Sequence, residues 1–373
     1  TTSGGGGGKG APSAPETTTF DYSVSLAIAL CEGEITHVGR IWADGTELAP
    51  DDLVMRVYHG TPDQLPDPRM EAVEGAGGVP AYRGTAYVVI EDLSLSAFGN
   101  RVPQFTFEVA RPSQPWQAGA ELDPARGVRG VAMLPGSGEY ALATTPVNKM
   151  FDFGKVELAN VNSPSTKADF LTSLDQMTGE LTRCGATSLI VSWFGDDLRC
   201  GNCTIRPKVE QTEFDSSNMP WQVGGLTRPQ AREVPRNDTD SPVYGGTPTD
   251  QSVIEAIQAL KDAGQDVMYY PFILMDQMAG NGLPDPYSDA LDQAVLPWRG
   301  RITSSTAPGQ PGSPDGTAAA VDEVNAFFGT AMASDFELIP EAENEGPMID
   351  ATEMAGFTGV QQISPVRYTG AAG

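Results

Sequence analysis

The sequence is poor in histidine, cysteine and positive charge, and it contains no long hydrophobic run. Two histidines and four cysteines among 373 residues leave few candidates for a metal centre or a disulfide framework. Lysine and arginine number 23 against 49 aspartates and glutamates, which gives a formal charge of −26 at pH 7. Such a negative field repels phosphate, so nucleic-acid binding is disfavoured. No stretch of about 18 apolar residues is present, so the sequence predicts no membrane span.

Glycine and proline are abundant, with 42 and 30 residues, and hydrophobic residues make up 40% of the chain. This balance predicts a globular, loop-rich protein of α+β class, long enough for two or three domains. Residues 1–19 are rich in Gly, Ser, Thr and Pro and lack the apolar core of a signal peptide, so they predict a flexible linker. Because the sequence does not begin with Met, we expect it to begin within a longer protein.

The first part of the chain, residues 20–146, has the pattern of a β-rich unit. Apolar and polar residues alternate over 22–30, and further strands are predicted at 35–42, 53–58, 86–90 and 105–109. Asp44-Gly45 supplies a hairpin turn signal after the second strand. A short helix is predicted over 66–73, with a glycine past its end.

Helices and buried strands alternate in the second part, residues 147–336. A helix is predicted over 167–181 with Thr166 as N-cap, and a nearly continuous apolar strand follows at 187–194. A second helix begins after Thr247 or Thr249 and closes at Gly264, before another buried strand at 267–274. This order predicts an α/β layer or barrel with parallel strands. A loop over 303–317, a helix over 319–330 and an irregular acidic segment or insertion over 337–373 complete the expectation.

Two groups of motifs occur in order along these two parts. The first group is LCEGEI at 30–35, IWADGT at 41–46, YHGTPDQLPDP at 58–68, YRGTAYVV at 82–89 and FGNRVPQ at 98–104. It resembles the hub region of siphophage tail-tip attachment (host specificity) proteins. The second group is SWFGDDLRCGNC at 192–203, RPK at 206–208, YGGTP at 244–248, YPFILMD at 270–276 and PWRGR at 297–301. It resembles the opening of the TIM-barrel-like, glycoside-hydrolase-like domain of the large gene-transfer-agent tail-tip protein.

The resemblance implies a tail hub domain over 20–146 and a partial TIM-barrel-like domain over 147–336. It also implies a virion protein at the distal end of the tail, which closes the tail tube as a homotrimer. Its partners would be other tail-tip proteins, such as hub and distal tail proteins, and the host surface through further domains. A TIM barrel needs eight strands, and the sequence pattern reveals two. We therefore expect a fragment cut at both ends, with an intrinsically shortened domain as the alternative.

Three aspartates follow the two buried strands of the second part. Asp196 and Asp197 come after the first strand and Asp276 after the second, so parallel strands would bring all three to one face. Glycosidases place two carboxylates roughly 5 to 10 Å apart on that face, and Trp193 is a candidate sugar-stacking surface. Structural capping, carbohydrate contact without turnover and glycoside hydrolysis all remain open. Because the decisive acids of barrel glycosidases usually lie on later strands, the sequence favours a non-enzymatic protein that carries host-facing domains.

Cys184, Cys200 and Cys203 are the remaining candidates for special chemistry. Structural zinc needs four ligands, and the second part holds no histidine and no second C-x-x-C pair. His37, His59 and Cys31 all lie in the first part. A Cys200–Cys203 disulfide, a disulfide to Cys184, a metal site and ordinary reduced thiols stay open, because virions leave the reducing cytosol. No cofactor is implied.

Overall fold

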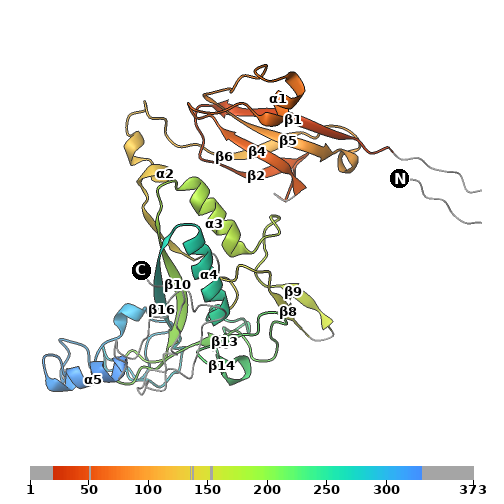
Figure 1. Cartoon of the computed structure of the whole chain (residues 1–373). Helices are drawn as coiled ribbons and strands as arrows, with labels where there is room; N and C mark the ends of the chain where they lie inside the picture. The colour runs from red at the N-terminus through yellow and green to blue at the C-terminus, as the bar shows by residue number, and fades with distance from the viewer. Residues whose placement is uncertain (1–19, 50–51, 135, 137, 152–153, 330–373) are drawn as a thin grey trace, which may run out of the picture. The chain divides into compact units, whose positions relative to one another are not determined.

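The structure is a computed structural model that describes residues 20–49, 52–134, 136, 138–151 and 154–329 (Figure 1). The chain divides into two compact units after Gly127, and residues 179–182 join the first of them. We call the first the β unit and the second the α/β unit. None of the helices in the described ranges has both the length and the apolar character needed to cross a bilayer. The class is α+β with several small sheets.

Two antiparallel sheets of three strands build the β unit. One has the order β1-β5-β4 and the other β3-β2-β6. The strands are β1 (Ser23–Glu32), β2 (His37–Ala43), β3 (Thr46–Glu47), β4 (Val54–His59), β5 (Thr85–Ser94) and β6 (Phe105–Ala110). Ile35, Val38 and Ile41 pack with Ala86 and Val88 in one cluster, so the two sheets share a core. The alternation seen in the sequence gives each sheet one apolar face, and the two faces cover each other.

Local turn chemistry shapes the edges of the β unit. Asp44 and Gly45 have φ values of 51° and 82°, and the β2–β3 hairpin turns there, as the sequence predicts. The helix α1 (Pro68–Glu74) begins two residues later than predicted, because Asp67 is its N-cap and accepts hydrogen bonds from the backbone N–H groups of Arg69 and Met70. Short helical turns, η2 (Ser96–Phe98), η3 (Ala120–Leu122) and α2 (Pro124–Gly127), follow.

Three parallel strands form the centre of the α/β unit. Strand β10 (Ala186–Gly195) pairs in register with β16 (Asp266–Met275) along its whole length and with β7 (Gly130–Met133) at its start. Helix α3 (Asp169–Glu180) lies between β7 and β10 in the chain, α4 (Asp250–Asp262) between β10 and β16, and α5 (Ala318–Phe328) follows β16. The parallel pairing of the two predicted strands is confirmed. In the described part of the chain these strands do not close into a barrel.

Several short elements surround this sheet. They are β8 (Asn148–Met150), β9 (Val156–Leu158), β11 (Ile205–Arg206), β12 (Lys208–Val209), β13 (Gln222–Val223), β14 (Leu226–Thr227), η5 (Arg228–Gln230), β15 (Arg232–Glu233) and η6 (Arg299–Arg301). Strand β11 pairs antiparallel with the end of β10. The others pair locally, β8 with β9, β12 with β15 and β13 with β14.

The third parallel strand has no counterpart among the strands predicted from the sequence. Residues 130–133 fall within the range 20–146 assigned there to the β-rich unit, but they pair with β10 as β7. The compact units therefore divide after Gly127 rather than after residue 146. Four residues are too few to display a period, so a short strand of this kind is invisible to pattern analysis. Likewise Thr166 has a φ of 60° and is not the N-cap, since α3 begins only at Asp169.

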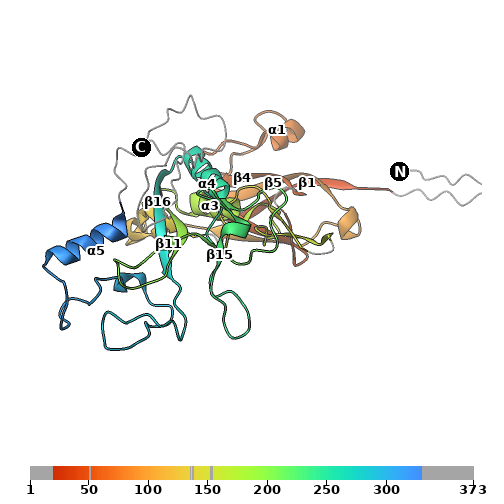
Figure 2. The same ribbon diagram turned by 90° about the horizontal axis from the view of Figure 1, so that it is seen from below.

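The two faces of the parallel sheet have different environments (Figures 1 and 2). On one face Leu189, Val191 and Trp193 are buried, and the Thr187 hydroxyl, on the same face, contacts the sulfur of Met177 in α3. Helices α3 and α4 supply the apolar cover, with Phe170, Leu174, Val253, Ile257 and Leu260 buried. On the other face Ile190 and Phe272 are only half-buried. Helices thus cover one side of the sheet, and loops border the other.

A buried ionic cluster holds the loops of the α/β unit together. The Arg228 side chain is 1% exposed and lies 2.6 Å from a carboxylate oxygen of Glu139 and 3.0 Å from one of Asp215. The Tyr140 hydroxyl donates to Asp215 at 2.8 Å, and burial raises the pKa of that hydroxyl. The backbone N–H of Thr249, the residue before α4, donates to the carbonyl of Glu139. This cluster joins three loop segments to the start of α4.

Candidate functional site

The ends of β10 and β16 bring polar side chains together at one edge of the parallel sheet. Gly195 and Met275 are paired in register, and the backbone N–H of Asp276 donates to the carbonyl of Gly195 at 3.1 Å. Asp196 and Asp276 are therefore neighbours, and the negative charge of Asp196 acts on the pKa of Asp276. The structure thus gathers the predicted aspartates at the carboxyl end of the sheet.

Asp276 is the most perturbed of these carboxylates. Its side chain is 7% exposed and forms an ion pair with Lys208, which is 13% exposed. Burial raises the pKa of Asp276, the Lys208 ammonium opposes the rise, and the charge of Asp196 adds to it, so the net shift is upward. Beside them the Tyr244 hydroxyl donates to the carbonyl of Met275 at 3.3 Å. Burial and the charge of Asp276 raise the pKa of Tyr244.

Asp197 has a structural environment instead. It accepts hydrogen bonds from the backbone and side chain of Arg199 and from the Gln293 amide, which donates at 2.7 Å. Although burial would raise the pKa of Asp197, these donors hold it below its ordinary value. Asp196 accepts a backbone hydrogen bond from Thr204 at 2.7 Å. Asp197 is therefore fully engaged in holding the loop after β10, while Asp276 and Asp196 border the sheet edge.

Trp193 lies on the helix-covered face of the sheet. It is 3% exposed, and its indole N–H donates to the Tyr269 hydroxyl at 3.1 Å. Its side chain alternates with those of Ser192 and Phe194, so it points away from the face that borders the loops. The indole is covered by its own protein here and offers no stacking surface to a sugar.

The cysteines lie at opposite ends of β10. Cys184 precedes the strand, whereas Cys203 contacts its last residue, since a Cβ on Gly195 would lie 3.3 Å from the Cys203 sulfur. Ten residues of strand separate these ends by roughly 30 Å, which excludes a bond from Cys184 to Cys203. Burial raises the pKa of Cys203 to about 12 and also raises that of Cys200, where the charge of Glu323 adds to it. Among the described residues no cluster of His, Cys, Asp and Glu could hold a metal ion.

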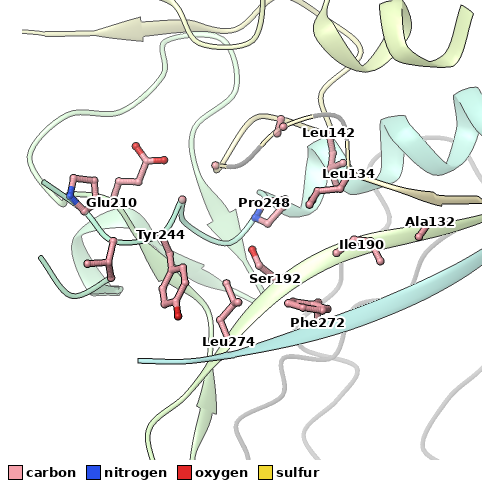
Figure 3. A pocket seen from close by; sticks show the side chains of 16 residues that line it. Ala132, Leu134, Leu142, Ile190, Ser192, Glu210, Tyr244, Pro248, Phe272 and Leu274 are labelled. Carbon is pink, nitrogen blue, oxygen red and sulfur yellow. The ribbon is translucent and has the colours of Figure 1, made fainter. Parts of the chain in front are cut away.

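A cavity of about 750 Å³ borders the open face of the sheet (Figure 3). Ile190 and Ser192 of β10 and Phe272 and Leu274 of β16 form its floor, as alternate residues on one face of the strands. Loop residues form the rest of the wall, among them Leu134, Leu142, Glu210, Tyr244 and Pro248. The lining is mainly apolar, with the Ser192 hydroxyl and the Glu210 carboxylate as polar points. Such a cavity can accept apolar side chains or the apolar face of a ligand.

Pattern analysis does not reveal this cavity, because its residues read as ordinary buried strand. The one signal is Ser188 and Ser192, two hydroxyls that recur on the face that borders the loops. The other cavity residues come from loops at 134–142 and 242–248, which no periodicity can place.

Comparison with known proteins gives one informative match. No protein-family model matches the chain, and no curated protein matches it either. A chain in a solved structure, described as the virion of a native gene transfer agent (GTA) particle, is 65% identical to it over the aligned part. That part is 31% of this chain, and the chain spans only 27% of the length of the virion chain. The TM-score of 0.29 is too low to support any conclusion about a shared fold.

Proposed function

We propose that this chain is a structural component of the tail tip of a phage or gene-transfer-agent particle, and that it acts by assembly. The observation that carries the proposal is the order of its parts: a β unit with the hub-like motifs, then a parallel sheet with the barrel-like motifs. The motif at 58–68 runs from the end of β4 through Asp67, the N-cap of α1, and the motif at 270–276 makes up most of β16. The 65% sequence identity over part of a chain in a gene-transfer-agent virion is in accord with a place in a virion.

The α/β unit supports this proposal because its sheet is incomplete. Strand and helix alternate through β7, α3, β10, α4, β16 and α5, which is the order of the first three units of a TIM barrel. In the ranges described, β16 has no further strand on its outer side, and the open face borders the cavity. We propose that the missing strands come from sequence outside these ranges, so that this chain is one part of a larger host-facing protein.

The β unit is proposed to be the ring-forming hub. Strand β1 is ten residues long and lies at the edge of its sheet, so its outer N–H and C=O groups can pair with a neighbouring subunit. A homotrimer would close the distal end of the tail tube and contact other hub and distal tail proteins.

Imaging of particles tests the proposal. A full-length protein with an affinity tag should label the distal end of the tail, and averaging should reveal threefold density there. An untagged particle preparation is the control. Labels that are absent from tails, or a full-length protein that stays a monomer in solution and is missing from particles, would contradict it.

A second function is favoured by one observation, the raised pKa of Asp276 beside Asp196. A carboxyl group of this kind at the carboxyl end of a barrel sheet suits carbohydrate binding or glycoside hydrolysis. The full-length protein would then bind or cleave host cell-wall polysaccharide, and Asp276→Asn would weaken that activity at least about tenfold. Arg199→Gln, which disturbs only the Asp197 loop, is the matched control. Binding that is equal in the wild type and Asp276→Asn removes this second function and leaves the first intact.

A further inference from the structure

Helix α5 is the least covered helix of the α/β unit. It has 11 residues, and none of them is buried. Val321, Val324 and Phe328 are 57%, 45% and 68% exposed, and their spacing of three and four residues puts them on one side of the helix. An isolated helix of this length is marginal in water, so most helices of this size depend on a packed apolar side. The apolar side of α5 therefore calls for a cover.

A groove of about 540 Å³ runs beside this helix. Val324, Phe327 and Phe328 form one wall, and Ile273, Ile302 and Pro308 contribute to the remainder. The groove is therefore largely apolar, with two charged side chains, Arg299 and Asp315, on its lining. We call it the α5 groove. Its apolar wall continues onto the exposed side of α5 through Val324 and Phe328.

The cation in the α5 groove has no carboxylate partner within the described ranges. The Arg299 guanidinium lies 3.9 Å from the centre of the Phe272 ring and 4.9 Å from that of Trp298, and it donates to the Tyr270 hydroxyl. One terminal nitrogen of Arg299 is buried without a hydrogen-bond partner. In a chain with 49 acidic and 23 basic residues, an arginine without a carboxylate stands out. The acids nearby do not serve it, since Glu323 binds Ser305 and Asp315 is exposed.

The sequence directly after α5 has the complementary chemistry. Residues 335–345 read DFELIPEAENE, with five acidic residues and an apolar group at Phe336, Leu338 and Ile339. Only six residues separate Phe336 from Gly329, the residue after α5. That tether reaches at most about 25 Å, which exceeds the roughly 16 Å length of an 11-residue helix. A tether this short holds the segment near the groove at an effective concentration on the order of millimolar.

We propose that residues 335–345 of this chain bind in the α5 groove. Phe336, Leu338 and Ile339 cover the exposed apolar side of α5, and a carboxylate of the segment pairs with Arg299. This inference goes beyond the proposed function, because it names an occupant for a surface of the α/β unit itself. While the segment is bound, the apolar side of α5 is closed to other proteins.

Photo-crosslinking in the full chain tests the proposal. A benzophenone side chain at position 324 should give cross-links to peptides from 335–345 of the same molecule. The matched control is position 156, which is also an exposed valine of the α/β unit and should give none of these products. A mixture of isotope-labelled and unlabelled protein separates cross-links within one molecule from cross-links between two.

Two sets of variants add a quantitative readout. Phe336→Ser with Leu338→Ser should lower the cross-link yield at least about tenfold, since it removes the apolar contact. Arg299→Gln should lower the yield by up to about fivefold and make it less sensitive to salt, because an exposed ion pair contributes little. Hydrogen exchange over β10 and α4 checks that each variant keeps its fold. Cross-links between molecules, cross-links to another segment, or no cross-link at all would overturn the proposal.

Discussion

In the β unit two sheets cover each other's apolar faces, whereas in the α/β unit helices cover one face of the sheet and a cavity borders the other. The first arrangement is self-sufficient, because Ile35 and Ile41 of one side meet Ala86 and Val88 of the other. In the second, Phe272 and Ile190 remain half-buried, and α5 buries none of its residues. The comparison teaches that this chain combines a finished module with one whose packing needs further residues.

Charged residues sharpen the same contrast. In the β unit Arg40 pairs with Glu108 at the surface, with side chains 54% and 44% exposed. In the α/β unit Arg228 and Glu139 are each 1% exposed. Loss of one partner of a buried pair leaves an unpaired charge in a medium of low polarity, whereas loss at the surface leaves it in water.

The largest effect is expected for Arg228→Met. It should lower the free energy of unfolding of the α/β unit by about 3–5 kcal/mol, since Glu139 is left buried and unpaired. Arg40→Met, the matched change in the β unit, should cost at most about 1 kcal/mol. Hydrogen exchange followed peptide by peptide reads the two units separately. Equal losses in both variants would show that the buried cluster does not hold the α/β unit together.

The two faces of the parallel sheet give the next prediction. Leu189→Ala on the helix-covered face should cost roughly 2–5 kcal/mol, because it leaves a cavity in a packed core. Phe272→Ala on the open face should cost only about 1 kcal/mol, although it removes a larger side chain, because that side chain is half-buried and gives up less contact. Urea unfolding monitored by hydrogen exchange in β10 provides the measurement. If Phe272→Ala proves as costly as Leu189→Ala, the open face is a finished core in the isolated chain.

A buried acid at the start of α4 makes the α/β unit sensitive to pH. Burial raises the pKa of Asp250 to about 7, while its carboxylate accepts a hydrogen bond from the Gly224 N–H at 2.6 Å. Because the folded-state pKa lies above the unfolded value near 4, stability is greatest below pH 4 for this group and is lost as the pH rises to 7. Asp250→Asn keeps an acceptor for Gly224 and should therefore stabilise the α/β unit at pH 8 by roughly 1–3 kcal/mol.

The gain from Asp250→Asn should vanish at pH 4, where the folded wild type is protonated and the unfolded chain largely so. Exchange of amides in α4 measured at the two pH values checks this, with the β unit as an internal reference. A gain of the same size at both pH values would mean that ionisation of Asp250 is not its cause.

The limits of sequence reasoning follow the same division between the two units. Long periodic segments, such as β1 and β16, are predictable because alternation or a continuous apolar run extends over many residues. The four residues of β7 carry no such period, so the sequence places the boundary between the units too late. The sheet-edge position of Asp196 and Asp276 follows from parallel strands, but the burial of Trp193 depends on which face α3 and α4 cover. The loops that line the cavity are positioned by contacts distant in sequence, and no local pattern encodes them.

The smallest expected effect concerns one glycine in each unit. Gly45 in the β2–β3 turn has a φ of 82°, and no atom lies within 4 Å of the place that a Cβ would take, so its need for glycine is conformational alone. Gly45→Ala should cost about 1–2 kcal/mol in the β unit, because an L residue is strained at that φ. Gly185, before β10, is equally open but has no such φ, so Gly185→Ala should be neutral or stabilise the α/β unit by up to about 1 kcal/mol. Thermal unfolding combined with hydrogen exchange in β2 and β10 separates the two. If both variants lose the same stability, loss of glycine itself and not the left-handed turn sets the cost, and the hairpin is less important to the β unit than its geometry implies.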